Sequence, residues 1–290
     1  MPYANRGSAR LYYDELGEGE PILTTHGVCE NGSYWSLPGV SERLAARYRV
    51  IDTDMRGHGR TTEPADAPGY DVETMAEDIG AIADHLGLER FHLLTHATGG
   101  IVGLRYAMRH GDRLLSLMST DTGSATAPTD HYCAPEFDDK DDYERLDPSQ
   151  NPMAVAYERL DPRSLLAKVR ESGRTEPFLN RLDDNPESDR CWRMVGDVLS
   201  SSDHTRFPAF MRTFYDDLDP KVKLLRGIPC PCLVLLGEHD TMFIKPGELL
   251  ARTIPDVEHV VLEGLGHMTA IEDPERTAAE LLSFLDAIPR

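Results

Sequence analysis

The fold is decided by one stretch of the sequence, Leu93-Leu94-Thr95-His96-Ala97-Thr98-Gly99-Gly100. An apolar strand pattern passes there directly into a helix pattern, so the chain needs a tight turn that lifts the central side chain above the sheet edge. Small residues flank the turn because the backbone is crowded at such a position. The central residue is Ala97, whose methyl group offers no atom that can attack a substrate.

Short strand-type runs alternate with helix-type stretches on both sides of this turn, a pattern typical of a parallel sheet with helices on both faces. We expect strands at residues 9–14, 21–25, 48–52, 91–94, 114–120, 232–236 and 259–262. We expect helices at 72–86, 99–110 and 272–285, the last with Ala279, Leu282 and Phe284 facing the core. The pattern therefore predicts an α/β fold.

Residues 125–220 break this alternation, because apolar side chains recur there at helical spacing without intervening strands. We therefore predict one sheet domain, residues 1–124 and 221–290, interrupted by a mainly helical cap at residues 125–220. Four aromatic cap residues are candidates for the wall of an apolar substrate pocket, although any one of them is more often cap core. They are Trp192, Phe207, Phe210 and Phe214.

The charge balance disfavours whole classes of partner. The 290 residues include 30 Lys and Arg against 50 Asp and Glu, a net charge of −20, which opposes binding to nucleic acid or to an anionic membrane. Apolar runs fall far short of the roughly 20 residues of a membrane span, and residues 1–17 lack a signal pattern. Five scattered cysteines fit a reducing compartment. We expect a cytoplasmic protein, and a homodimer stays open.

Further motifs follow one another in a specific order around the central turn. Residues 95–99 fit the pattern small-x-nucleophile-x-Gly. The others are Thr25-His26-Gly27-Val28, Asp54-Met55-Arg56-Gly57-His58-Gly59-Arg60-Thr61, Gly237-Glu238-His239-Asp240 and Gly264-Leu265-Gly266-His267. In these motifs and their order the chain resembles the α/β-hydrolase family. The resemblance implies a mostly parallel, eight-stranded sheet with helices on both faces and a helical cap insertion.

The same resemblance implies the roles of site residues. Position 97 is the nucleophile position, where a serine is expected, Asp240 is the acid and His267 is the base. Asp121 lies 24 residues after Ala97 and is the alternative acid. The backbone amides of Val28 and Thr98 are the implied oxyanion donors.

Chemistry at this site depends on the residue at position 97. A hydroxyl there needs His267 to take its proton, whereas alanine abolishes the covalent step and leaves the pocket. The resemblance thus implies a hydrolase of small, largely apolar carboxylic esters or lactones, inactive in this form because of Ala97. Ala97 either replaces a serine removed to stop turnover or is native. A native alanine would suit a small-molecule binding protein, or a cofactor-free lyase or oxygenase that uses the His–Asp pair as its base.

Several residues near the implied site also have structural interpretations. Gly27 and Cys29 are candidate substrate contacts, and Cys29 is more often a small apolar filler. His96 is expected to be packed and hydrogen-bonded, and His26 and His58 to order loops through backbone hydrogen bonds. No phosphate-binding glycine loop or metal-ligand spacing is present in the sequence, so no cofactor or metal is predicted.

Overall fold

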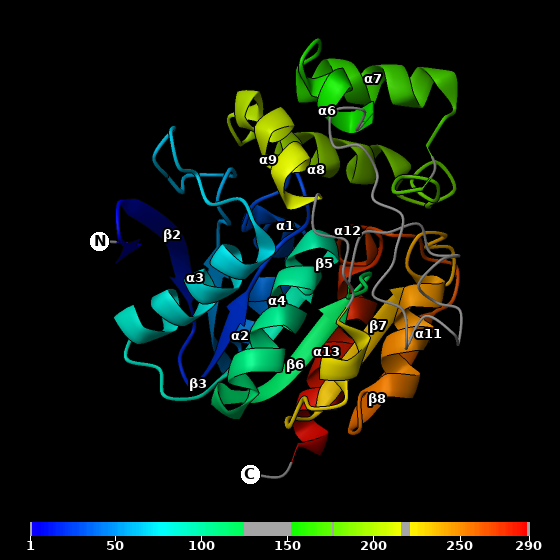
Figure 1. Cartoon of the computed structure of the whole chain (residues 1–290). Helices are drawn as coiled ribbons and strands as arrows, with labels where there is room; N and C mark the ends of the chain where they lie inside the picture. Colours follow the sequence, from blue (N-terminus) through cyan, green and yellow to red (C-terminus); the bar gives the residue numbers. More distant parts are fainter. Residues whose placement is uncertain (1, 125–151, 176, 216–220, 289–290) are drawn as a thin grey trace.

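The computed structural model describes residues 2–124, 152–175, 177–215 and 221–288 (Figure 1). Within them, eight strands form one sheet in the order β1-β2-β4-β3-β5-β6-β7-β8. The strands are β1 (Tyr3–Arg6), β2 (Ala9–Leu16), β3 (Glu20–Thr24), β4 (Tyr48–Thr53), β5 (Phe91–His96), β6 (Leu114–Thr120), β7 (Cys232–Gly237) and β8 (Val257–Leu262). β2 runs antiparallel to β1 and β4, and the other neighbours are parallel. This confirms the predicted mostly parallel, eight-stranded α/β sheet.

The central strands show why the sequence pattern predicts their positions. Every residue of β5 and β7 is buried, because parallel strands covered on both faces need continuous rather than alternating apolar runs. All predicted strands are present, with ends that differ by two residues at most. β1 is absent from the prediction, since four residues that include Asn5 and Arg6 give too short a pattern to separate from a loop.

Helices cover both faces of the sheet, as predicted (Figure 1). α3 (Val72–His85) and α4 (Ala97–His110) pack together on one face, and α2 (Val40–Ala45) and α13 (Pro274–Ala287) pack together on the other. α11 (Ile244–Thr253) contacts β7 and β8. The short elements are α1 (Ser33–Ser36), η1 (Gly111–Arg113), α10 (Val222–Leu225) and α12 (Thr269–Glu272).

The predicted core face of the last helix is wrong in part. Ala279 is exposed and Leu282 is only half-buried, whereas the neighbouring Ala278 and Leu281 are buried. The helix begins at Pro274, after the side chain of Asp273 caps its first turn by accepting from the backbone N–H of Arg276. Adjacent apolar residues, such as Ala278 with Ala279 and Leu281 with Leu282, left the inward face of this helix ambiguous in the sequence. In the structure the inward face is shifted by about one residue from the predicted one.

The described part of residues 125–220 is helical and lies over the end of the sheet that carries α1 and the start of α4 (Figure 1). It contains α6 (Pro152–Tyr157), α7 (Pro162–Ser172), α8 (Ser188–Ser200), η4 (His204–Arg206) and α9 (Phe207–Phe214). Hydrogen bonds tie it to the core, for example from Asn31 Nδ2 to the carbonyl oxygen of Val198 at 2.9 Å. The domain boundaries stay a prediction, because residues 125–151 and 216–220 lie outside the described part.

Candidate active site

The turn between β5 and α4 has the shape that its sequence predicts. Ala97 is the first residue of α4 and has a φ of +46°, in the left-handed region that side chains normally avoid. Gly99 is required nearby, because a Cβ atom there would lie 2.5 Å from the carbonyl oxygen of His26. Thr122 Oγ1 donates a hydrogen bond of 2.5 Å to the Ala97 carbonyl. This turn at residues 95–99, called the elbow below, is therefore fully formed around a residue whose side chain has no nucleophilic atom.

The predicted acid and base are hydrogen-bonded to each other. His267 Nδ1 lies 2.9 Å from Asp240 Oδ2, and both side chains are buried. The other carboxylate oxygen, Oδ1, accepts from the backbone N–H groups of Met242 and Phe243 at 3.2 Å each. Because a carboxylate only accepts, Nδ1 of His267 carries the hydrogen and Nε2 remains as the basic nitrogen.

This pair lies beside the elbow. The ring of His96, the residue before Ala97, has its centroid 4.8 Å from that of His267. Gly237, at the end of β7, makes the approach of the His267 loop feasible, since a Cβ atom there would lie 1.9 Å from the carbonyl oxygen of Gly266. Residues that are far apart in sequence thus meet at one edge of the sheet.

Asp121, the alternative acid, has other partners. It follows β6 with a φ of +49° and is fully buried. Its Oδ1 accepts from the Gly237 N–H at 3.0 Å, and its Oδ2 accepts from Thr269 Oγ1 at 2.6 Å. The imidazole nearest to Oδ2 is that of His96, at 3.6 Å. Of the two candidate acids, Asp240 is the one that hydrogen-bonds to His267.

Side chains hold two backbone donors of the loop after β3, one on each side of Val28. The Gly27 N–H donates to Glu30 Oε2 at 2.6 Å, and the Cys29 N–H donates to His58 Nε2 at 3.0 Å. The Val28 N–H between them has no hydrogen-bond partner in the described part of the chain. The Thr98 N–H, in the first turn of α4, lacks an intrahelical acceptor as well. Both groups predicted as oxyanion donors are therefore uncommitted.

Two histidines order this loop through hydrogen bonds to backbone groups, as the sequence predicts. His58 Nδ1 donates to the Arg56 carbonyl at 2.8 Å, and His26 Nε2 accepts from the Met55 N–H at 3.0 Å. Burial keeps the pKa of His58 well below its usual value, so the ring is neutral and its Nε2 can accept from Cys29. Backbone hydrogen bonds of these rings fix the conformation in which the Val28 N–H is free.

A residue that the sequence interpretation missed holds the His267 loop. Glu272 accepts from the N–H of Gly266 at 2.7 Å and from the N–H of Met268 at 3.0 Å, one on each side of the histidine. Burial raises the pKa of this carboxyl group to about 7. A glutamate five residues after a histidine carries no distinctive spacing signal, so only the folded loop reveals its role.

Two tyrosines of the helical segment reach the elbow and the loop after β3. The Tyr215 hydroxyl lies 3.0 Å from Thr98 Oγ1, and the Tyr157 hydroxyl hydrogen-bonds with the Cys29 thiol. Burial raises the pKa of that thiol, which fits the prediction of an unreactive filler. These hydroxyls are polar groups in an otherwise apolar region.

The predicted aromatic wall divides into two groups. Phe207 and Phe210 pack on the ring of His58, with centroid separations of 5.3 and 4.5 Å, and Phe214 stacks on Phe210. Trp192 instead donates from Nε1 to Asp183, a contact within the helical segment. Two other rings, those of Phe178 and Phe243, lie 5.0 and 5.5 Å from the ring of His267.

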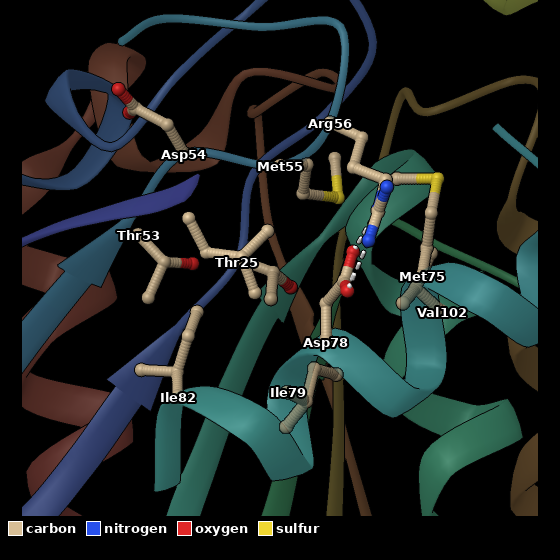
Figure 2. A pocket seen from close by; sticks show the side chains of 11 residues that line it. Thr25, Thr53, Asp54, Met55, Arg56, Met75, Asp78, Ile79, Ile82 and Val102 are labelled. Carbon is tan, nitrogen blue, oxygen red and sulfur yellow. Dashed lines mark hydrogen bonds and ion pairs between the residues drawn. The ribbon is translucent and has the colours of Figure 1, made fainter. Parts of the chain in front are cut away.

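Figure 2 shows a small cavity lined by the turn after β4 and by α3, where Arg56 and Asp78 face each other. The guanidinium forms two contacts with the carboxylate, at 2.5 Å from Nε and 2.9 Å from Nη2. The cavity has a volume of about 20 Å³, whereas small-molecule sites usually occupy roughly 300 Å³ or more. The ion pair therefore anchors the turn at residues 54–61 to α3 and does not mark a substrate site.

No group of three or more His, Cys, Asp or Glu side chains is arranged to hold a metal ion among the residues described. Of the helices that the structure describes, none has the length and apolar character needed to cross a bilayer.

The chain is similar to known proteins in sequence and in fold. A family model described as alpha/beta hydrolase fold matches residues 20–274. A protein named "Putative carbamate hydrolase RutD", from Azorhizobium caulinodans, is 39% identical over 117 residues, which are 40% of this chain and 43% of that protein. Non-heme chloroperoxidase CPO-A1 from Kitasatospora aureofaciens is 29% identical over 297 residues, covering 97% of this chain and 98% of that one. The enol-lactonase structure from Burkholderia xenovorans LB400 has a TM-score of 0.78 at 23% identity, covering 98% of this chain and 100% of that one, a likeness of fold.

Proposed function

Because this chain belongs to the α/β hydrolase fold family, we propose that it carries the site of a carboxylic ester or lactone hydrolase with alanine at the nucleophile position. One observation carries the proposal: the His267–Asp240 hydrogen bond is intact beside an elbow whose central residue has no hydroxyl group. The uncommitted N–H groups of Val28 and Thr98 support it, because an acyl-transfer site needs two donors for the oxyanion.

With a serine at position 97, the chemistry follows from the geometry. The hydroxyl attacks the ester carbonyl while its proton passes to Nε2 of His267, and Asp240 stabilises the resulting imidazolium. The Val28 and Thr98 amides receive the oxyanion, and collapse expels the alkoxide, which takes the proton from His267. With Ala97 the acyl-enzyme cannot form, so the chain binds such a substrate and turns it over only marginally.

The substrate class is inferred from the surroundings of the pair. The rings of Phe178 and Phe243 lie against His267, whereas Phe207 and Phe210 are completely buried against the ring of His58 and belong to the packed core. Apolar walls with few polar groups favour a small, largely apolar substrate. Two similar proteins are named as an enol-lactonase and a putative carbamate hydrolase, and both activities involve attack on an acyl carbonyl.

Restoring the nucleophile tests the proposal. Intact-mass labelling with a fluorophosphonate probe needs an activated serine and no knowledge of the substrate. Ala97→Ser is expected to gain one adduct, whereas the unaltered chain is expected to gain none. Ala107→Ser is a matched control, since it places a serine in the same helix, α4, away from the pair. Failure of Ala97→Ser both to label and to cleave a simple aryl ester would remove the hydrolase proposal.

A second function is favoured by the unused base. The His267–Asp240 pair is complete without any nucleophile to activate, so the pair could abstract a proton from a carbon acid, as in a cofactor-free lyase or oxygenase. Incubation of the unaltered chain with candidate ketones in deuterated water would report this activity as carbon-bound deuterium. Loss of the exchange in His267→Ala would assign it to the pair, and no exchange with any ketone would leave binding alone.

A further inference from the structure

A closed cluster of charged groups lies directly behind the elbow. His96 is fully buried, which agrees with the prediction of a packed histidine. Its ring stacks on that of Tyr34, with centroids 4.0 Å apart and an angle of 13° between the planes. The proposed mechanism uses neither of these side chains.

Two buried carboxylates face the two nitrogens of this ring. Glu30 Oε1 lies 3.5 Å from Nε2, and Asp121 Oδ2 lies 3.6 Å from Nδ1. Thr120 Oγ1 also lies 3.3 Å from Nδ1. Burial opposes a positive charge on His96, but the two carboxylates outweigh it and raise its pKa to about 9. At neutral pH the ring therefore carries a positive charge between the two carboxylates, although its Nε2 makes no hydrogen bond within the described residues.

The cluster is connected to the proposed oxyanion site. Glu30 uses its second oxygen, Oε2, to accept the Gly27 N–H at 2.6 Å, one residue before Val28. Burial works to raise the pKa of Glu30, but the adjacent His96 holds it below its usual value. At the other end, Asp121 accepts from Gly237 and Thr269. A continuous chain of contacts thus runs from the ends of β6 and β7 to the loop that carries the Val28 N–H.

We propose that His96 is a positioning residue, a buried cation that holds Glu30. Through Glu30 it fixes the loop after β3 that carries the Val28 N–H, called the oxyanion loop below, against the elbow. It touches neither a substrate nor the reacting atoms, and acts through the backbone of the loop. Its effect on catalysis rests on the proposed hydrolase function, whereas its charge and its contact with Glu30 do not.

Every element packed against the ring bears on its protonation. The facing groups are Glu30 and His26 from the loop after β3, Tyr34 and Trp35 from α1, Asp121 and Thr120 from β6 and its end, and His267 from the loop after β8. Above about pH 9 the ring becomes neutral and can donate from only one nitrogen. Glu30 then loses its cation, and the oxyanion loop loses its anchor.

The charge can be measured in the unaltered chain by NMR of ¹³C-labelled histidine, with His96 assigned by the loss of its signal in His96→Gln. We expect His96 to be an imidazolium at pH 7.5 and to titrate near pH 9. Glu30→Gln should move this midpoint down by about one pH unit or more, since it removes the nearest charge. A neutral His96 at pH 7, or a midpoint unchanged in Glu30→Gln, would overturn the proposal.

The positioning role is tested by labelling rates in the Ala97→Ser background. His96→Gln keeps an amide donor toward Glu30 and should lose the fall in rate above pH 9. His96→Asn is too short to reach Glu30 and should label roughly tenfold or more slowly at every pH, with an unchanged circular dichroism spectrum. Equal rates in a folded His96→Asn would refute the role.

Glu30→Gln provides the independent variant should His96→Asn fail to fold. In the Ala97→Ser background its alkaline fall should shift to lower pH in parallel with the NMR midpoint, and a fall that stays near pH 9 would contradict the proposal. If Ala97→Ser alone does not label, the hydrolase function fails, and the NMR titration still decides the state of His96.

Discussion

The turn at Ala97 and the loop at His267 both rely on crowded backbone, yet only the loop carries a reactive side chain. At the turn, φ of Ala97 is +46° and Gly99 admits the carbonyl oxygen of His26. At the loop, Gly237 admits the backbone of Gly266, and Glu272 holds the amides on both sides of His267. Under the proposed hydrolase function, the loop supplies the base and the elbow lacks only the hydroxyl group of a nucleophile.

The two regions also differ in what maintains them. A buried carboxylate is costly unless it is hydrogen-bonded, and Asp240 meets this condition with His267 and two backbone donors. The elbow instead carries backbone strain of about 1 kcal/mol or more, because a left-handed residue other than glycine is disfavoured. The surrounding helix and sheet hold the elbow whether or not a hydroxyl is present, which is why its shape survives with alanine.

The largest expected effect distinguishes the two candidate acid partners of His267, Asp240 and Asp121. In the Ala97→Ser background, Asp240→Asn is expected to slow fluorophosphonate labelling by about a thousandfold or more, because it removes the anion that orients His267 and stabilises its cation. Asp121→Asn keeps an acceptor for Gly237 and should slow labelling by less than about tenfold. Pseudo-first-order labelling rates measure both. The opposite ranking would move the acid role to Asp121.

A smaller effect should appear in the pH dependence of stability at the same loop. Burial raises the pKa of Glu272 from 4.5 to about 7, so its contribution to stability is complete below pH 4.5 and is lost as the pH rises through 7. Glu272→Gln cannot ionise. The free energy of unfolding of Glu272→Gln, measured relative to that of the unaltered chain, should therefore increase by about 2 kcal/mol between pH 5 and pH 8.

Urea unfolding at the two pH values measures this difference. Glu275→Gln is the matched control, because Glu275 lies one helix later with its side chain 82% exposed, and its relative stability should not change with pH. A Glu272→Gln variant that behaves like the control would show that Glu272 does not titrate in this range, and that the loop is as insensitive to pH as the elbow.

Most of the fold could be predicted because central strands and amphipathic helices repeat over many residues. The strand β5 and the helix α3, predicted at residues 91–94 and 72–86, are examples, and both are confirmed. β1 and the inward face of α13 were missed or misplaced. A short edge strand depends on its partner strand, and a helix with adjacent apolar residues depends on its N-terminal cap.

The site was predictable to the extent that its residues belong to ordered motifs. The pairing of Asp240 with His267 follows that pattern, whereas the contacts of Glu272, Glu30 and Tyr157 do not. Tyr157 reaches Cys29 from a distant part of the chain. The amides that Glu272 and Glu30 accept lie only three to six residues away, but no distinctive spacing marks such contacts in the sequence. Trp192 shows the converse, since its aromatic ring suggested a pocket wall and its indole N–H donates to Asp183 within the helical segment.

The smallest effect tests the strain at the elbow itself. Ala97→Gly removes a left-handed alanine, and relief of strain should offset the lost methyl burial and the greater flexibility of glycine. Its free energy of unfolding should therefore be unchanged or higher by up to about 1 kcal/mol. Ala107→Gly, buried in the regular part of α4, should lose about 2 kcal/mol, since it gains no relief. Equal losses in the two variants would mean that the elbow carries no strain and that its shape depends on the alanine side chain after all.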